Sequence, residues 1–212
     1  MSGAREQRIG EVVGRVARQA LADRGRSRIA LLDDGSPEAA LAARLLARAL
    51  GDGAVVRITL REGEMDPLLQ PGGPAAGERL REETMRMRAR LLDDALPAHP
   101  ANKTALLLGG ELPPEPLLPL GDLWASEVAA LQGAWSAPGE VRALAEAAGG
   151  IEALDAALRR WIDERDPAGL DPLPGDAAAR VRRGFAAGSA ARRNPRLVPK
   201  LGSRTLCVDL SE

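Results

Sequence analysis

The chain has very few aromatic side chains: no tyrosine, one phenylalanine and three tryptophans in 212 residues. A hydrophobic core must therefore be built mainly from alanine, leucine and valine. Cysteine occurs once, at Cys207, which excludes an intrachain disulfide; we expect a packed thiol there. Lysine occurs only at positions 103 and 200, so arginine carries nearly all the positive charge. The single histidine, His99, lies among prolines, and we expect it to have no role in function.

Other absences limit the class of protein. The net charge is −1, so the chain has no overall attraction for nucleic acid or anionic lipid. No apolar run has the length of a membrane span, and the first residues lack the apolar core of a signal peptide. We therefore expect a cytoplasmic protein that binds neither nucleic acid nor membranes. A hydrophobic content of 45% is ample for one large domain with its own core.

Short apolar runs alternate with helical patterns in the first half of the chain, which predicts an α/β fold with a parallel sheet. The expected strands are Arg28–Leu32, Ala54–Leu60 and Thr104–Gly110. The expected helices are Arg5–Arg24, Pro37–Leu50 and Ala76–Leu96. Ser36 suits the N-cap of the second helix, and Pro37 suits its first turn, where a missing N–H costs nothing.

The second half has a different character. Prolines between residues 111 and 120 exclude a helix or a central strand there. Further helices are expected over residues 121–135, 138–148, 151–165 and 176–187, the first with Asp122 as its candidate N-cap. Residues 166–175 should form a linker, and a basic tail over 191–212 includes a possible strand, Arg204–Leu210. We expect one domain: an α/β core (1–110), a proline-rich loop (111–120), a helical portion (121–190) and the tail.

The turn after the first strand is the most informative feature. In an open parallel sheet this turn normally binds nucleotide phosphates, through backbone N–H groups at a helix N-terminus. Such a turn needs glycines, and only Gly35 is present, while Asp33, Asp34 and Glu38 add three carboxylates. These charges would repel a polyphosphate. The turn is therefore a phosphate site that was lost or rebuilt. A hard-cation site is an alternative, although carboxylates are also favourable at a solvated helix N-terminus by themselves.

Several segments together carry a family resemblance. DGSPEA (34–39) and ALG (49–51) are similar to an SGGxDS turn and the end of the helix after it. EETMRMRA (82–89) is similar to NxQARxRM, and PLGDLWASEV (119–128) to PIGDLYKTQV. GGIEALDAALRRWID (149–163) is similar to a late helix of the same family. On these segments the chain, over roughly residues 5–195, resembles the ammonia-dependent NAD synthetase family of PP-loop ATP pyrophosphatases. The resemblance implies a Rossmann-like, three-layer α/β/α fold with a helical C-terminal portion.

The departures from the family pattern fall on the groups that would hold ATP and Mg²⁺. The family's loop Ser, second Gly, Asp and last Ser become Asp34, Ser36, Glu38 and Ala39. Its metal-binding Glu and the acidic loop after the third strand are interpreted as deleted. Cations of the family become Ala125 and Ala191. The pair Asn102–Lys103 precedes the expected third strand, whereas the family's NK pair follows it, so we interpret it as a coincidence in a loop.

The resemblance with these departures predicts an NAD synthetase-like protein that has lost ATP-dependent amidation of deamido-NAD. The vestigial nucleotide-binding positions are Asp34, Gly35, Ser36, Glu38 and Ala39. Arg86, Arg88 and Asp122 are candidates for binding a ligand or a partner; Arg88 is expected to face solvent. No catalytic residue and no metal site are predicted, and ATP, Mg²⁺ and NAD or deamido-NAD are expected only if the site functions.

Two other functions remain open. One is a divergent but active NAD synthase, or another ATP-dependent amide-forming ligase. The other is a nucleotide or small-ligand sensor that keeps a pocket without the reaction. The resemblance also implies a homodimer, because the family is dimeric; a complex with a paralogous active synthetase is the alternative partner.

Overall fold

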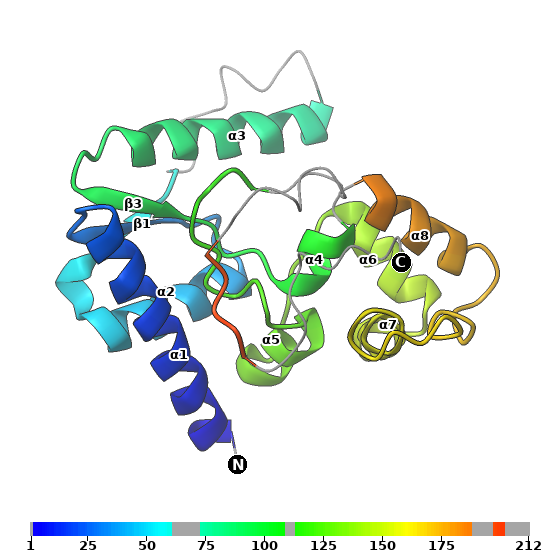
Figure 1. Ribbon diagram of the computed structural model, residues 1–212. Helices are drawn as coiled ribbons and strands as arrows, with labels where there is room; N and C mark the ends of the chain where they lie inside the picture. The colour runs from blue at the N-terminus through cyan, green and yellow to red at the C-terminus, as the bar shows by residue number, and fades with distance from the viewer. Residues whose placement is uncertain (1, 61–72, 109–112, 188–196, 202–212) are drawn as a thin grey trace.

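The computed structural model describes residues 2–60, 73–108, 113–187 and 197–201. A parallel sheet is built in the first half of the chain (Figure 1). The elements of this half are α1 (Ser2–Asp23), β1 (Arg28–Leu32), α2 (Pro37–Leu50), the short 3₁₀ turn η1 (Asp52–Ala54), β2 (Val55–Ile58), α3 (Gly73–Arg90) and β3 (Ala95–Ala98). The α/β class predicted from the alternating pattern is confirmed.

The strand order is β2-β1-β3, with β1 parallel to both neighbours. Ile29 pairs with Val55 on one side and Leu96 on the other. Beyond β3, isolated parallel bridges join Ala98 to Leu117 and Leu117 to Leu197. The proline-rich segment is therefore extended and continues the sheet without forming a full strand. This fits prolines, which remove ladder donors.

Burial on both faces of β1 creates the layers. Ile29 and Leu31 pack in one core cluster with side chains of α1 and α2. Ala30 and Leu32 face the other way, into a second cluster with Met85 and other residues of α3. Successive side chains of a strand point to opposite faces, so helices on both sides are needed to cover it. Figure 1 shows α3 on one side of the sheet and α1 with α2 on the other.

The second half is helical and has its own core. Its elements are α4 (Lys103–Leu108), α5 (Ala125–Gln132), α6 (Gly139–Ala147), α7 (Ile151–Leu158), a π-helical turn η3 (Arg159–Asp163) that continues α7, and α8 (Ala177–Ala187). Trp124 is buried in this core, while Trp135 and Trp161 pack against it half-buried. Figure 1 shows α4, α6, α7 and α8 grouped beside the sheet.

The third strand lies elsewhere than the sequence predicts. The segment expected as a strand, Thr104–Gly110, begins as part of helix α4, and its last two residues lie outside the described residues. The strand is Ala95–Ala98, which the prediction had divided between the end of a helix and a loop. A short, fully buried apolar run has no periodicity that separates strand from helix, and Pro97 disguises the true strand.

Other boundaries shift less. Helix α3 ends at Arg90 instead of Leu96, and α5 begins at Ala125 instead of Gly121. Ser36 is the N-cap of α2, as predicted, with Pro37 in its first turn. The expected strand Arg204–Leu210, Cys207 and most of the basic tail lie outside the described residues.

Helices α1 and α2 approach each other closely where α1 has glycine. A Cβ atom built on Gly14 would lie 2.4 Å from the Cβ of Ala49, whereas one on Gly10 would meet Leu45 at an ordinary 3.6 Å. Beside this contact, Arg18 donates from Nη1 to the carbonyl oxygen of Ala49, 2.8 Å away, at the C-terminal end of α2. The two helices are thus joined by a close approach and a cap.

We expect Gly14→Ala to destabilise the protein and Gly10→Ala, its matched control, not to. Both substitutions gain up to about 1 kcal/mol of helix propensity, but only Gly14→Ala forces the helices apart, at a typical cost of about 1–3 kcal/mol. Urea unfolding of the two variants measures the difference. Equal stability of both variants would show that the α1–α2 contact relaxes without cost.

Candidate functional site

Side-chain oxygens of the turn between β1 and α2 accept hydrogen bonds from the turn's own backbone. Asp33 Oδ1 accepts from the N–H of Gly35 at 3.1 Å, and Asp34 Oδ1 accepts from the N–H of Ser36 at 3.0 Å. Ser36 Oγ accepts from the N–H of Ala39 at 3.1 Å. Gly35 has φ +80°, a conformation that side-chain-bearing residues rarely adopt. Three N–H groups that an anion could use are therefore already bonded.

The carboxylates of the turn have different surroundings. Asp33 is buried and forms an ion pair with Arg57 of β2, whereas Asp34 is exposed. The charge of Asp33 is therefore neutralised by a described cation in direct contact, and that of Asp34 is not. The negative charge that a helix N-terminus favours is supplied here by the chain itself.

Glu38 points into the protein. It is 3% exposed, and its carboxylate accepts from Asn102 Nδ2 at 2.9 Å. It also accepts from the backbone N–H of Ser136 at 3.0 Å and from Ser136 Oγ at 2.6 Å. Asn102 follows β3, and Glu38 follows β1. The group thus lies where the carboxyl ends of two adjacent strands diverge, which is the usual ligand crevice of an open α/β sheet.

The place of Asn102 and Lys103 corrects an interpretation made from the sequence. Because the third strand is Ala95–Ala98, the pair follows that strand and does not precede one. Asn102 Oδ1 accepts from the N–H of Ala105 at 2.9 Å, at the start of α4. The pair therefore occupies the position, after the third strand, that the resemblance assigns to the family's NK pair.

Lys103 is the buried cation of the site, and sequence reasoning missed it. Its side chain is 0% exposed, with Nζ 2.8 Å from Asp163 Oδ1 and 3.9 Å from Asp122 Oδ1. The same ammonium lies 4.5 Å from the ring centre of Trp124. A buried lysine needs such partners. The available signal was its identity, as one of only two lysines in an arginine-rich chain.

Asp122 does not cap a helix, so that prediction is wrong. The N-cap of α5 is Trp124, whose N–H donates to Glu127 Oε2 at 2.9 Å. Asp122 is buried beside Lys103, and its Oδ2 accepts from the N–H of Leu201 at 2.7 Å. It therefore connects the cluster around Lys103 to the described segment 197–201.

Arg86 is held by three carboxylates. Its Nε is 2.9 Å from Glu115 Oε1 and its Nη1 is 2.5 Å from Glu83, while Nη2 pairs with Glu82. Burial alone would lower the pKa of Arg86, but the charges of Glu115 and Glu82 outweigh it and raise that pKa. The guanidinium is therefore committed within the protein, not directed at a phosphate.

His99 and Arg88 lie near Arg86 in different settings. His99 Nε2 is 3.2 Å from Glu82 Oε1, a contact that lowers the pKa of Glu82 despite the burial of that carboxyl. Arg88 is exposed, as predicted, and donates from Nη1 to the carbonyl oxygen of Thr59 at 3.0 Å. Arg86 and Arg88 thus point to different faces, as their spacing of two residues requires.

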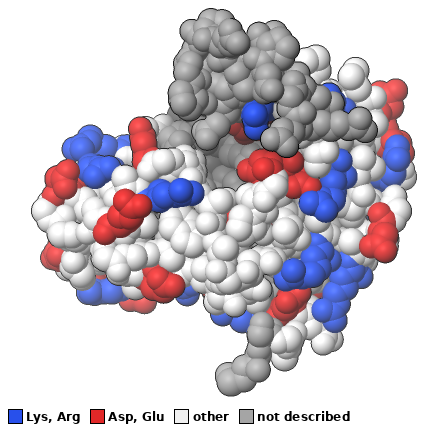
Figure 2. All heavy atoms as spheres, turned by 180° about the vertical axis from the view of Figure 1, so that it is seen from behind, with Lys and Arg blue, Asp and Glu red and all other residues white. Residues whose placement is uncertain are grey.

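Metal binding and membrane spanning can both be assessed on the described residues. Among the residues that the structure describes, no group of three or more His, Cys, Asp or Glu side chains could hold a metal ion. None of the helices in the described ranges is both long and apolar enough to cross a bilayer. Basic and acidic side chains are interspersed over the described part of the face in Figure 2; the absence of nucleic-acid binding stays a prediction.

Comparison with known proteins identifies the fold. No protein-family profile and no curated protein sequence matches the chain. A solved structure does: the NH3-dependent NAD synthetase from Campylobacter jejuni subsp. jejuni NCTC 11168, in complex with the nitrate ion. The TM-score is 0.63, with 17% sequence identity over 90% of this chain and 97% of that chain. This chain has the fold of an NAD synthetase. The Rossmann-like architecture implied by the resemblance is thereby confirmed, and identity this low shows the fold alone.

A further buried carboxyl of this chain, that of Asp155 on α7, lies beside Thr104, the residue that follows Lys103. Its Oδ1 accepts from Thr104 Oγ1 and its Oδ2 from the N–H of Ser126, both at 2.7 Å. Burial raises the pKa of Asp155, although these hydrogen bonds and the charge of Arg159 act to lower it. The charged form is thus disfavoured in the folded state.

We expect Asp155→Asn to gain stability relative to the parent protein as pH rises. The folded pKa of Asp155 is higher than the unfolded one, so its contribution is present below the unfolded value, about pH 3.9. That contribution is lost as pH rises through the folded pKa. Asparagine does not titrate. Urea unfolding of both proteins between pH 4 and 7 measures the trend, with Glu152→Gln, an exposed change on the same helix, as the control. A stability difference that is independent of pH contradicts the assignment.

Proposed function

We propose that this chain is an NAD synthetase-like protein that has lost ATP-dependent amidation of deamido-NAD and acts as a structural, regulatory or ligand-binding protein. The observation that carries the proposal is the turn at residues 33–39, where Asp33, Asp34 and Ser36 bond to three N–H groups that a phosphate would need. An incoming phosphate has to displace these oxygens and then face their charge.

The other groups around the turn support the same proposal. ATP with Mg²⁺ needs cations and oxygen ligands directed at the phosphates. Arg86 is enclosed by carboxylates, and Lys103 is enclosed by Asp163, Asp122 and Trp124. Glu38 is bonded to Asn102 and Ser136. These contacts support the proposal that the described residues do not hold ATP–Mg²⁺.

A second candidate is a divergent, active NAD synthase or another ATP-dependent amide-forming ligase. The observation that favours it is the position of Asn102 and Lys103, which directly follow the third strand. If Lys103 exchanged Asp163 for a substrate phosphate, one cation of the reaction would be restored. Under this candidate ATP, Mg²⁺ and deamido-NAD would be the ligands. Activity assays separate the two proposals.

We expect calorimetric titration with ATP–Mg²⁺ to give a dissociation constant weaker than about 1 mM. The variant Asp34→Ser with Ser36→Gly removes one charge and the Ser36 hydroxyl, and it replaces the Asp34 carboxylate by a weaker hydroxyl acceptor, so it should bind ATP measurably better. Asp52→Asn, which removes an exposed carboxylate outside the turn, should change nothing. Micromolar binding by the unmodified chain would sink the proposal that the turn excludes phosphate.

We further expect no NAD above the uncatalysed background when the chain is incubated with deamido-NAD, ATP, Mg²⁺ and ammonia. Each missing contact to a transition state typically costs about 10²–10³ in rate. Restoring the turn at residues 34 and 36 should improve binding without producing turnover, since Arg86 and Lys103 stay paired with their carboxylates. NAD formation by the unmodified chain would establish the second candidate instead.

The partner proposed for this chain is a second copy of itself, with a paralogous active synthetase as the alternative. Support comes from the C-terminal end of α3 and the residue that follows it, where Met87 is 59% and Leu91 is 75% exposed. These are the exposed large hydrophobic side chains among the described residues. Contiguous exposed apolar surface marks interaction sites.

We expect light scattering to return the mass of a dimer at micromolar concentration, with an interface on the order of 2,000 Å² or more. Leu91→Glu should shift the equilibrium towards monomer, because it places a charge at the exposed apolar position that directly follows α3. Ala40→Glu, at an exposed position of α2, should leave the mass unchanged. A monomer in the unmodified protein would favour a role in a complex with a different chain.

A further inference from the structure

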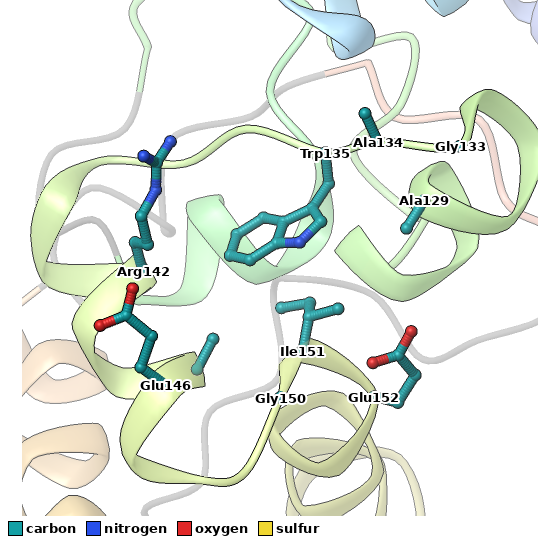
Figure 3. Close-up of a pocket in the computed structure, with 10 residues that line it drawn as sticks. Ala129, Gly133, Ala134, Trp135, Arg142, Glu146, Gly150, Ile151 and Glu152 are labelled. Carbon is teal, nitrogen blue, oxygen red and sulfur yellow. The ribbon is translucent and has the colours of Figure 1, made fainter.

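A shallow pocket of about 660 Å³, largely open to solvent, lies between α5, α6 and α7, apart from the turn at residues 33–39. Figure 3 shows the indole of Trp135 projecting into the pocket, with Ile151 below it. The interior thus offers a large aromatic surface and an aliphatic wall.

Charged side chains stand around the indole. Glu146 on α6 and Glu152 on α7 lie on either side of it in Figure 3, and Arg142 extends on the side opposite Glu152. In the described part of the chain, neither glutamate forms an ion pair with a cation. Two carboxylates against one guanidinium give the pocket a net negative charge.

Two of the residues that line the pocket are glycines. Gly133 ends α5 with φ +73°, and Gly150 precedes α7 with φ +131°. Both conformations favour glycine, so neither position contributes a side chain to the rim. Apart from the indole, access to the interior is therefore bordered mainly by the backbone and by the charged groups.

We propose that this pocket binds a small organic cation, a ligand with a quaternary ammonium or guanidinium group on a short apolar stem. A cation over an indole face is attracted by the ring quadrupole, and quaternary ammonium groups are bound in this way by aromatic cages. Glu146 and Glu152 add Coulomb attraction from both sides, while Ile151 and the alanines of the wall contact the stem. The charge of the pocket matches a cation better than an anion.

The probe for this site is butyltrimethylammonium, compared with 1-butanol and pentanoate as neutral and anionic ligands of similar stem. The readout is the indole N–H signal of Trp135 in ¹H–¹⁵N spectra, assigned with Trp135→Phe. We expect the cation to give a saturable shift of this signal at millimolar concentrations. Equal shifts from 1-butanol would overturn the proposal, because a charge-independent response identifies a merely apolar depression.

Variants separate the charge from the aromatic contribution. Glu146→Gln with Glu152→Gln changes only exposed side chains and should weaken binding of the cation roughly three- to tenfold. Trp135→Leu removes the indole signal, so binding to that variant is measured on the backbone N–H signal of Gly133, which also lines the pocket; its saturable shift should be abolished. Glu140→Gln, an exposed change on α6 outside the pocket, should leave binding unchanged. Stronger binding of pentanoate than of the cation would assign the pocket to anions through Arg142 and overturn the proposal. Failure of the cation to saturate the signal would do the same.

Discussion

The buried carboxylate of Glu38 joins three parts of the chain that are far apart in sequence. It lies in the first turn of α2, and it accepts hydrogen bonds from Asn102 after β3 and from Ser136 after α5. A buried donor left without its acceptor costs about 1–3 kcal/mol. The position of α2, the start of α4 and the connection from α5 to α6 therefore all depend on this one group. It also lies at the carboxyl ends of β1 and β3, the edge at which an open α/β sheet usually binds its ligand.

The turn before Glu38 solves the same electrostatic problem that a phosphate solves in other proteins. A helix N-terminus presents unpaired N–H groups and a partial positive charge. Here the oxygens of Asp33, Asp34 and Ser36 satisfy these groups from within the chain. A site completed by its own side chains is stable without a ligand. Under the proposed function, the same completeness makes it a poor receptor for an anion, because binding has to break existing hydrogen bonds first.

The sequence predicted the fold class because its strongest signals are local. Alternating apolar runs and helical stripes identified β1, α2 and β2, and Ser36 and Pro37 marked the start of α2 correctly. The third strand could not be predicted in the same way. Ala95–Ala98 is four residues long and contains Pro97, while the five-residue run Thr104–Leu108 satisfies either a helix or a strand. Only pairing with β1 distinguishes the two segments, and pairing is a property of the tertiary structure.

The candidate site was predictable only where it is continuous in sequence. The positions of the turn were identified from residues 33–39 alone, but the partners of Glu38 and Lys103 come from segments that only folding brings together. The same holds for Glu115, the distant partner of Arg86. The consequence is largest at the third strand. Because β3 is Ala95–Ala98, Asn102 and Lys103 follow it and lie at the edge of the sheet where ligands usually bind. From the sequence alone, this pair was interpreted as a coincidence in a loop.

That shift in position does not by itself restore a catalytic cation. Lys103 is completely buried, and its ammonium already has an aspartate at 2.8 Å and the face of Trp124 at 4.5 Å. Removing a buried lysine from its partner leaves the partner's charge uncompensated, which is strongly destabilising. A phosphate would have to replace Asp163 and neutralise Lys103 while approaching Asp122, a second carboxylate 3.9 Å from the same nitrogen. The lysine therefore occupies the expected place in the fold while its charge stabilises the junction between α4, η3 and the segment before α5. Position and availability of a functional group are separate properties, and the proposed loss of amidation rests on the second.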